Sequence, residues 1–495
     1  MNQEITNPKR TDKENGRYYL YEPNGKVLKR NCTYFKMMTS KYYVNIGDQK
    51  ASLIKNPKHE WYLNIMIMVQ LPDKKIKQTF QMLTKDLPTA VEHFINEFNC
   101  NEMKKGILLY NKQEEIRQWL KTSDYCAFIA DGSILPREKD TELAMKKAKP
   151  FVSCTADRIQ IGELVGMGIK RGVTVITGGG YSGKSTLLDA ISNGIYNHIA
   201  GDGREYVITD SSAMKISAED GRSVSNLNIS AFIRWIPGAD TSRFTTAHAS
   251  GSTSQAANII EAVNDGSKLL LIDEDKSATN FMIRDHVMQH LVQNDPIIPF
   301  TDRVQELYKT QMVSTILVIG GSSEYLKVSD EIILMKNFMP YDVSQEAKSL
   351  VTQGHERDSV TLATAQWKCI SKINLNQFSP YTTENGISEH LEISKKGFLE
   401  IGDECIDVRM IHNIADVAQL TAIGFLIRKM ELANKEKELD LKEMVEAYIQ
   451  TLDMGELDEI YSTYFTKCDR WLEMPRSLEV LAILHRMRLI THGSR

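Results

Sequence analysis

Residues 178–186, Gly-Gly-Gly-Tyr-Ser-Gly-Lys-Ser-Thr, constrain the possible fold of this chain more than any other segment. They match the pattern G-x-x-x-x-G-K-[ST], in which a glycine loop turns its backbone N–H groups inward around phosphate oxygens. The apolar residues 173–177 predict a buried strand before the loop, and residues 187–193 predict a helix after it. This strand–loop–helix order predicts a nucleotide site in an α/β sheet, with a chance match in a glycine-rich turn as the alternative. The fixed positions are Gly178, Gly183, Lys184 and Ser185.

The pattern assigns a role to each polar group of the loop. Lys184 is expected to reach the β- and γ-phosphates of ATP, and the Ser185 hydroxyl is expected to bind Mg²⁺. The predicted cofactor contacts in this segment are Gly178, Gly180, Tyr181, Ser182, Gly183, Lys184, Ser185 and Thr186.

A second segment supplies acidic groups. The apolar run 268–272 ends in Asp273 and Glu274, and apolar strands often end in acids by chance. At a strand end Asp273 can bind Mg²⁺, and Glu274 can polarise the water that attacks the γ-phosphate. Upstream of Asp273, Ser-Gly-Ser-Thr-Ser-Gln (250–255) opens a helical stretch, and Ser-Ala-Thr-Asn (277–280) follows Glu274.

The order of these segments resembles that of an ABC-class ATPase. In that class the Ser-Gly helix start is the signature loop, which binds the γ-phosphate of the nucleotide held by the other subunit. The resemblance thus implies further nucleotide contacts at Ser250, Gly251, Ser252 and Ser277. Strong resemblance covers about 120–345 and is to the soluble "predicted ATPases of the ABC class", a family that includes a kinetoplastid mitochondrial RNA-processing protein. It is carried by FIADGSILPRE (128–138), GDGREYVITD (201–210), AEDGRSV (218–224), ASGSTSQAANI (249–259), LLIDEDKSATNFMIRD (270–285) and STILVIGGSSEY (314–325).

Two features depart from the general ABC pattern. In the signature loop, Ser252 replaces a glycine and Thr253 replaces a glutamine. After the apolar strand 316–319 the class has a switch histidine, but this chain continues Gly-Gly-Ser-Ser-Glu and has no histidine between 290 and 355. Candidates for the missing γ-phosphate contact are Ser322 and Ser323. Candidates for the unassigned Q-loop glutamine are Glu219, Asp220 and Arg222.

Composition limits the other possibilities. At 495 residues, with 42% hydrophobic and 25% charged residues, the chain is expected to be globular, with two or three domains. Its apolar runs fall short of the ~18–20 residues of a membrane span, and its polar first residues do not resemble a signal peptide. Seven scattered cysteines without a C-x-x-C pair favour reduced thiols and no zinc site, so we expect a cytoplasmic protein without a membrane partner.

Basic residues are concentrated at the start of the chain. Residues 1–150 contain 26 Lys and Arg against 18 Asp and Glu, whereas the whole chain has a net charge of −4. Aromatic rings among basic side chains suit single-stranded nucleic acid, because rings stack on bases and cations meet phosphates. A short β-meander with half-buried tyrosines and a solvated lysine face explains the pattern equally well. The interleaved residues are Arg17, Tyr18, Tyr19, Tyr21, Lys26, Lys29, Arg30, Tyr34, Phe35, Lys36, Lys41, Tyr42 and Tyr43.

The expected organisation has three parts. Residues 1–149 form a basic α+β domain, with residues 1–15 disordered, strands over 17–71, a helix over 76–98 and a short helix over 113–121. Residues 150–342 form the nucleotide-binding core, in which strands 173–177, 269–273 and 315–319 are parallel and central. Residues 343–495 form a β-then-helical part, with strands over 367–402 and helices over 415–433, 439–453 and 478–489.

Two arginines in the family-like segments have two interpretations each. Arg137 and Arg284 are either phosphate, RNA or interface contacts, or partners in structural bridges to carboxylates.

These observations predict an ATPase in which two copies enclose two ATP·Mg²⁺, with Glu274 driving hydrolysis and RNA as the partner on which the motion acts. The RNA is single-stranded or structured and binds the basic N-terminal domain. The alternative is a nucleotide-switched regulatory ATPase that acts on proteins and has no nucleic-acid ligand. A kinase using the same loop is disfavoured, since it would give Ser250-Gly251 and Ser277-Ala278 no role.

Overall fold

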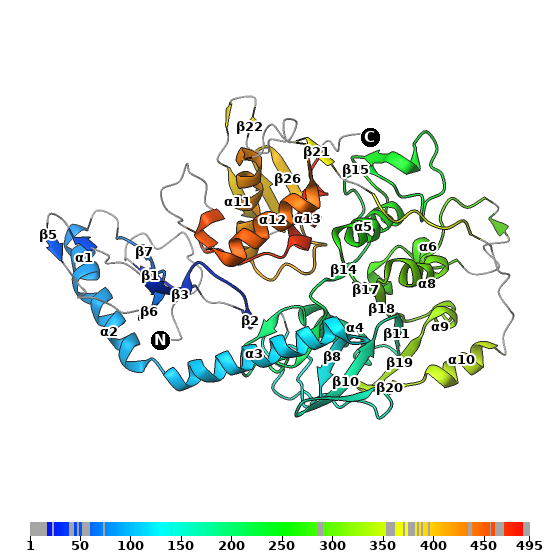
Figure 1. Cartoon of the computed structure of the whole chain (residues 1–495), viewed down its shortest axis with the longest axis horizontal. Helices are drawn as coiled ribbons and strands as arrows, with labels where there is room; N and C mark the ends of the chain where they lie inside the picture. Colours follow the sequence, from blue (N-terminus) through cyan, green and yellow to red (C-terminus); the bar gives the residue numbers. More distant parts are fainter. Residues whose placement is uncertain are drawn as a thin grey trace.

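A computed structural model shows how the chain folds (Figure 1). The structure describes residues 17–21, 24–38, 44–46, 49–51, 60–72, 75–139, 141–284, 291–292, 294–352, 362–369, 372–374, 382–383, 386–387, 390–394, 397–433, 438–455, 457–460 and 470–488. The disorder expected for 1–15 therefore lies outside the described residues.

A six-stranded sheet forms the centre of the molecule. Its strands are parallel except for the last, which pairs antiparallel with its neighbour. The expected parallel central strands are confirmed, since all three lie side by side within this sheet. In spatial order the strands are β14 (Ala213–Ile216), β17 (Leu269–Asp273), β18 (Ser314–Val318), β11 (Val173–Thr177), β19 (Glu331–Lys336) and β20 (Met339–Asp342).

The sheet is buried on both faces because alternate residues of each strand enter different apolar clusters. On one face Val175, Leu270 and Ile272 pack with α5, α8 and the C-terminal helices. On the other face Ile176 and Leu271 pack with α4 and a second sheet. The core helices and short strands are α4 (Lys184–Asn193), α5 (Gly251–Asp265), α6 (Thr279–Met282), α8 (Phe300–Gln311), α9 (Glu324–Val328), α10 (Ser344–Thr352), β12 (Asn197–His198), β15 (Val224–Leu227) and β16 (Phe244–Thr246), with 3₁₀ turns at Thr241–Arg243 and Glu274–Lys276.

The second sheet is antiparallel and crosses a predicted domain boundary. It has the order β13 (Val207–Thr209), β8 (Tyr125–Ala130), β10 (Leu164–Lys170) and β9 (Arg158–Ile161). The boundary expected at residue 150 falls inside this sheet, because β8 precedes it and pairs with β10 after it.

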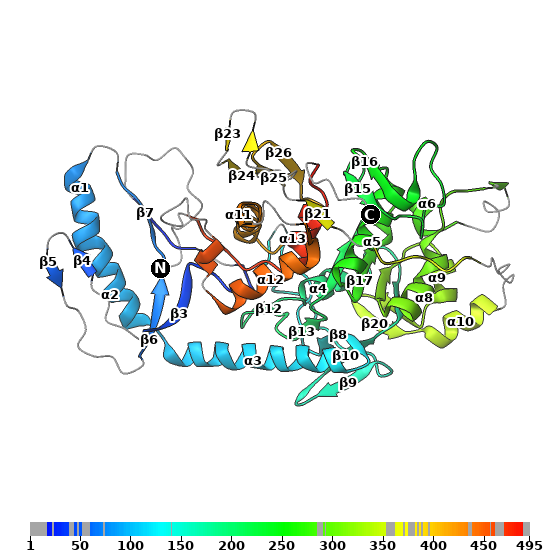
Figure 2. The same ribbon diagram turned by 45° about the horizontal axis from the view of Figure 1, so that its top comes forward.

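The helix preceding this sheet is longer than predicted. Helix α3 spans Cys100–Thr122, whereas apolar spacing predicted only 113–121. Its four buried residues all lie from Gln113 onward, whereas apolar residues of its first half, such as Ile107 and Leu108, are exposed. The Asn99 side chain caps the helix by accepting from the N–H groups of Asn101 and Glu102. In Figures 1 and 2, α3 extends from the core to the N-terminal strands.

The N-terminal part is a set of small strand pairs and helices, as expected from its alternating pattern. Two-stranded pairs form between β1 and β7, β3 and β6, and β4 and β5, while β2 pairs with β12 of the core. The elements are β1 (Arg17–Tyr19), β2 (Lys26–Val27), β3 (Thr33–Met38), β4 (Val44–Ile46), β5 (Gln49–Ala51), β6 (Glu60–Ile65), β7 (Met68–Gln70), α1 (Ile76–Gln81), a π-helical segment (Met82–Asp86) and α2 (Leu87–Glu97).

The C-terminal part has strands followed by helices, which confirms the predicted order. Its helices lie between the N-terminal strands and the core in both views (Figures 1 and 2). They share an apolar cluster with α5, so this part and the core are not separately packed. The elements are β21 (Lys372–Asn374), β22 (Thr382–Thr383), β23 (Gly386–Ile387), β24 (Leu391–Ser394), β25 (Phe398–Ile401), β26 (Glu404–Asp407), α11 (Val417–Ala433), β27 (Glu438–Asp440), α12 (Leu441–Met454), a 3₁₀ turn (Leu457–Ile460) and α13 (Ser477–Leu484).

Several basic and aromatic residues proposed as an RNA surface instead hold the N-terminal part against the C-terminal part. Lys29 Nζ donates to the carbonyls of Leu452, Asp453 and Gly455 at 2.6, 2.8 and 2.7 Å, which satisfies the free C-terminal carbonyls of α12. Arg30 forms an ion pair with Glu473, whose side chain is fully buried.

The tyrosines of the same stretch are also engaged. The Tyr21 hydroxyl donates to Glu473, Tyr18 donates to the Met82 carbonyl, and Tyr19 donates to Gln70. Lys29, Arg30 and these three tyrosines are therefore structural, and their assignment to RNA is corrected. Lys41, Tyr42 and Tyr43 lie outside the described residues.

Among the described residues, no helix is both long enough and apolar enough to cross a bilayer.

A buried carboxylate pair joins the two sheets of the core. Glu331, which begins β19, accepts a hydrogen bond from the Thr174 hydroxyl at 3.1 Å and is only 9% exposed. Burial and the neighbouring Asp157 raise the pKa of Glu331 from 4.5 to about 8. The folded chain thus binds this proton more tightly than the unfolded chain. The resulting stabilisation is complete below pH 4.5 and is lost as the pH rises through 8.

We therefore expect Glu331→Gln to raise the apparent Tm at pH 8.5 and to leave it nearly unchanged at pH 5. The amide keeps a hydrogen-bonding group but never becomes a buried charge. A gain of roughly 2–4 °C at pH 8.5 would correspond to about 1 kcal/mol. Differential scanning fluorimetry at both pH values measures it, with the exposed Glu163→Gln as control. An equal Tm difference at the two pH values would rule out the titration.

Candidate nucleotide-binding site

The loop between β11 and α4 has the backbone that the glycine pattern requires. Gly178 and Gly183 have φ of 146° and 102°, which favours glycine. A Cβ on Gly178 would lie 2.5 Å from the Met335 carbonyl oxygen, so space excludes a side chain there as well. Tyr181, at φ 58°, is fully exposed at the tip of the loop.

The lysine and serine of the pattern lie where the loop meets α4. Lys184 Nζ donates to the carbonyls of Gly178 and Gly179 at 2.7 and 2.9 Å, so the ammonium lies across the loop. Ser185 is exposed in the first turn of α4, next to Thr186. The N-terminal end of this ten-residue helix carries partial positive charge, which favours an anion.

Two observations fit a phosphate ligand in this loop. A Cβ on Gly179 or Gly180 would meet nothing within 4 Å, so open space lies beside both glycines. The Ser182 hydroxyl is buried and has no hydrogen-bond partner within the part of the chain that the structure describes. Phosphate oxygens can accept from this hydroxyl, so the loop residues fit the expected nucleotide.

The two acids predicted for catalysis lie on the same edge of the sheet as the loop. β17 is parallel to β18, and β18 is parallel to β11, so the carboxyl ends of these strands meet. Asp273 ends β17, is 5% exposed and accepts from the Asp275 N–H at 3.2 Å. Burial raises the pKa of Asp273, and a bound cation would favour its charged form. Asp273 and Ser185 are the side chains that would hold Mg²⁺.

Glu274 follows directly and is bound by backbone groups. One carboxylate oxygen, Oε2, accepts from the N–H of Gly320 at 2.6 Å and of Gly321 at 3.3 Å. These glycines follow β18, at the place where the ABC pattern has its switch histidine. The hydroxyl of Ser322, a candidate for that role, accepts from the Glu324 N–H at 3.2 Å.

The predicted signature loop begins α5. Ser250 is the exposed residue before the helix, and its hydroxyl bonds that of Thr253 at 3.0 Å. Ser252 is partly exposed in the first turn. A Cβ on Gly251 would lie 3.1 Å from the Asp220 carboxylate, which shows how closely the neighbouring segment approaches the loop.

A buried glutamine that sequence reasoning did not single out joins this helix to the acidic strand end. Gln255, fully buried, donates to the Ser277 hydroxyl at 3.0 Å and accepts from the Ala278 N–H at 2.8 Å. The Ser277 hydroxyl in turn donates to the Asp273 carbonyl at 2.8 Å. Ser277, predicted as a nucleotide contact, is thus part of a link between α5 and Asp273. Its contact with nucleotide stays a prediction.

Two of the three proposed Q-loop substitutes are buried and bonded to other side chains. Glu219 accepts from Arg486 and Asn258, and Arg222 donates to Asn258 and to Glu261. These bonds connect α5 to the end of the chain, so the assignment of Glu219 and Arg222 to the Q-loop is corrected. A buried charge requires a partner of opposite charge, and Glu219 and Arg222 have theirs in Arg486 and Glu261. Neither side chain is therefore available to a site that faces solvent.

The same region is closed by a buried histidine–carboxylate pair. His485 Nε2 lies 3.1 Å from Asp265 at the end of α5. Both ends of α5 are therefore bonded to neighbouring segments. Its first turns contact the segment after β17 through Gln255, and its last turn contacts the C-terminal part through Asp265.

The two singled-out arginines form structural bridges. Arg137 donates to the carbonyl and carboxylate of Asp202 at 2.6 and 2.7 Å, and Arg284 forms an ion pair with Asp295 at 2.5 Å. The structural interpretation of both is confirmed.

Comparison with known proteins agrees with this geometry. A family model described as the ABC_ATPase P-loop domain matches residues 99–369, which is more than half of the chain. The chain belongs to the ABC-class ATPases. A second model, the MRB1590 C-terminal domain, matches residues 392–492, and together they confirm the predicted family.

Proteins similar to this ABC ATPase include one uncharacterized protein and two solved structures of low identity. An uncharacterized protein of Methanocaldococcus jannaschii, MJ1628, is 31% identical over 290 residues. The match takes in 54% of this chain and 61% of the relative, so it leaves much of both uncompared. Two solved structures are similar at low identity. One is cbiO1 from Clostridium perfringens, part of an ABC transporter complex, with 13% identity, TM-score 0.30, and coverage of 47% of this chain and 94% of that chain. The other is the ADP conformation of MJ1267, an ATP-binding cassette of an ABC transporter, with 15% identity, TM-score 0.29, and coverage of 46% and 96%.

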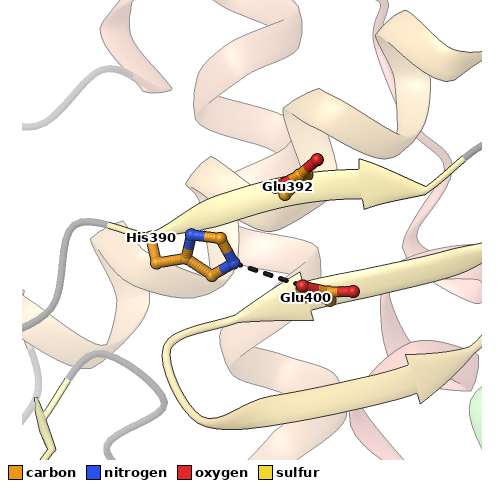
Figure 3. Close-up of side chains that lie close together, drawn as sticks. All are labelled: His390, Glu392 and Glu400. Atoms are coloured by element: carbon orange, nitrogen blue, oxygen red, sulfur yellow. Dashed lines mark hydrogen bonds and ion pairs between the residues drawn. The ribbon is translucent and has the colours of Figure 1, made fainter.

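One group of possible metal ligands lies in the C-terminal part of this ABC ATPase. His390 directly precedes β24, Glu392 lies on β24, and Glu400 lies opposite Glu392 on β25 (Figure 3). His390 Nε2 is 3.3 Å from Glu400. Histidine spacing alone did not indicate this group, because the strand pairing brings it together. His390 and Glu392 are exposed and Glu400 is partly buried; all three lie outside the ATPase core sheet.

Proposed function

We propose that this ABC ATPase binds ATP·Mg²⁺ in its phosphate loop and hydrolyses it at an interface between two copies of the chain. The single observation that carries the proposal is the shared sheet edge. The phosphate loop with Lys184 follows β11 there, and Asp273 and Glu274 lie at the end of β17, with β18 pairing in parallel with both strands. Lys184 binds and orients the terminal phosphates. Glu274 orients a water and accepts its proton, and Mg²⁺ neutralises charge on the phosphates.

The exposed Ser250 loop supports the dimer. The loop begins α5, which leads into β17, so it lies at the same sheet edge as Asp273, and Ser250 is exposed there. A second copy bringing its phosphate loop to this surface would complete two sites. ATP then favours the closed pair and hydrolysis favours the open one, which is a population shift driven by the γ-phosphate.

The connection from α5 to the C-terminal part supports transmission of this motion. Arg486 is ion-paired with Glu219 at 2.5 Å and also bonds Asn258 of α5. Since a buried charge pair is costly to break, α5 and the end of the chain are expected to move together.

RNA remains the proposed partner in a cytoplasmic setting. Its support is the match to the MRB1590 C-terminal domain, the resemblance to an RNA-processing family and the basic N-terminal part. With Lys29 and Arg30 engaged elsewhere, we place the contact on the free half of α3, where Lys104, Lys105 and Tyr110 are exposed. A regulatory ATPase acting on proteins is the alternative.

Fluorescence anisotropy with a ~20-nucleotide RNA tests this partner. Affinity should fall with salt, with a log–log slope of about 0.7 per phosphate contact. Lys104→Glu/Lys105→Glu should flatten the slope by about 1.4, whereas Lys268→Glu/Lys309→Glu, on the opposite edge of the core, should not. Absence of binding at low salt with ATP present would favour the protein-acting alternative.

A further inference from the structure

Two glycines follow β18 on the sheet edge that carries the phosphate loop. Ile319 N–H donates to the Ile176 carbonyl at 3.0 Å, which extends the pairing of β18 with β11. Gly320 and Gly321 therefore follow at the level where the phosphate loop begins. These two glycines lie at the carboxyl edge of the central sheet, where Asp273 and Lys184 also lie.

Two adjacent N–H groups converge on a single negatively charged oxygen here. Gly320 and Gly321 donate to Glu274 Oε2 at 2.6 and 3.3 Å. Successive backbone amides that point to one place bind anions, and bonds to ionised oxygens are stronger than neutral ones. The Glu274 carboxylate thus shows that the pair accepts an anion.

The surroundings leave room for a different anion. A Cβ on Gly321 would meet nothing within 4 Å, and one on Gly320 would meet only Glu274 Oε2, at 3.8 Å. Neither glycine has a positive φ, so no unusual backbone conformation requires glycine here. The absence of a side chain instead leaves the two N–H groups accessible to a ligand.

We propose that the amide pair of Gly320 and Gly321 is a subsite for the terminal phosphate of a nucleoside triphosphate, and that Glu274 occupies it until that phosphate binds. The proposal rests on the nucleotide-binding function proposed above. It gives backbone groups the role expected of Ser322, Ser323 or a switch histidine. Lys184, like Glu274, is bonded to backbone groups of the protein, in its case the carbonyls of Gly178 and Gly179.

The exchange couples binding to catalysis. A γ-phosphate oxygen that accepts from the amide pair displaces Glu274, whose carboxylate is then free to orient a water. A diphosphate does not reach the pair, so Glu274 stays bound. The chain therefore prefers a triphosphate to a diphosphate through these two N–H groups.

Gly321→Pro tests the subsite because proline lacks the N–H, while the preceding Gly320 tolerates the restriction that proline imposes. Affinities for Mg·AMP-PNP and Mg·ADP are measured by isothermal titration calorimetry. Gly321→Pro should weaken AMP-PNP about tenfold, the scale of one charge-assisted hydrogen bond, and change ADP less than twofold. Gly321→Ala keeps the N–H and should keep the wild-type ratio of the two affinities, as should Ser323→Ala.

Hydrogen exchange of the peptide containing residues 316–323 gives a second measurement that does not depend on a proline variant. In Glu274→Ala the amides should exchange faster than in wild type, and AMP-PNP, but not ADP, should restore protection. An equal loss of both affinities in Gly321→Pro, no loss of either, or protection that ADP also restores would overturn the subsite. If wild type bound neither nucleotide, the proposed function itself would fail.

Discussion

Glu274→Gln is expected to lower kcat for ATP hydrolysis by at least ~10²-fold while leaving ATP affinity near that of wild type. That factor is the usual cost of losing a group that accepts or orients the reacting proton. The glutamine can still accept from the Gly320 and Gly321 N–H groups, so the loop after β18 should keep its conformation. Steady-state phosphate release and binding of a fluorescent ATP analogue measure the two effects.

Lys184→Ala provides the contrast. The ammonium bridges the loop carbonyls and would bind the β- and γ-phosphates, so its removal should weaken nucleotide binding itself. A Glu274→Gln enzyme that hydrolyses ATP at the wild-type rate would show that another group activates the water.

The phosphate loop and the central strands could be predicted because their signals are local. The glycine pattern reports backbone conformations, such as φ of 146° at Gly178, that only glycine adopts readily. The apolar runs of β11, β17 and β18 report burial on both faces. Asp273 and Glu274 follow from their place after such a run, since parallel strands carry functional groups at their carboxyl ends.

The misassigned residues depend on distant partners. Lys29 and Arg30 look like a nucleic-acid surface in sequence, but their partners are Leu452 and Glu473, more than 400 residues away. Glu219 has its partner in Arg486. Nothing in a local pattern distinguishes a lysine that caps a helix from one that meets phosphate.

The groups that sequence reasoning missed have no residue signature. Gly320 and Gly321 act through backbone N–H groups, which every residue except proline has, so their role appears only when Glu274 is placed beside them. Gln255 was visible in the signature segment, but its link to Ser277 and Ala278 requires α5 and β17 to be packed.

Ser250→Arg is expected to abolish ATP-dependent dimerisation and ATPase activity while leaving ATP binding to the single chain intact. The serine is exposed at the start of α5, where the proposed interface requires a close approach to the other copy's γ-phosphate. Arginine adds bulk at that contact, and the loss should be complete because both composite sites contain the residue. The phosphate loop of the same chain leads into α4 rather than α5, so the substitution does not alter it.

Light scattering of the Glu274→Gln background with Mg·ATP measures the dimer, because slow hydrolysis keeps the closed pair populated. Thr310→Arg is the matched control. Thr310 is exposed in the last turn of α8, which leads into the amino end of β18, so the same bulk and charge lie on the opposite edge of the sheet. The control should still dimerise. A Ser250→Arg chain that hydrolyses ATP at the wild-type rate would instead leave a P-loop ATPase that completes its site without a second copy.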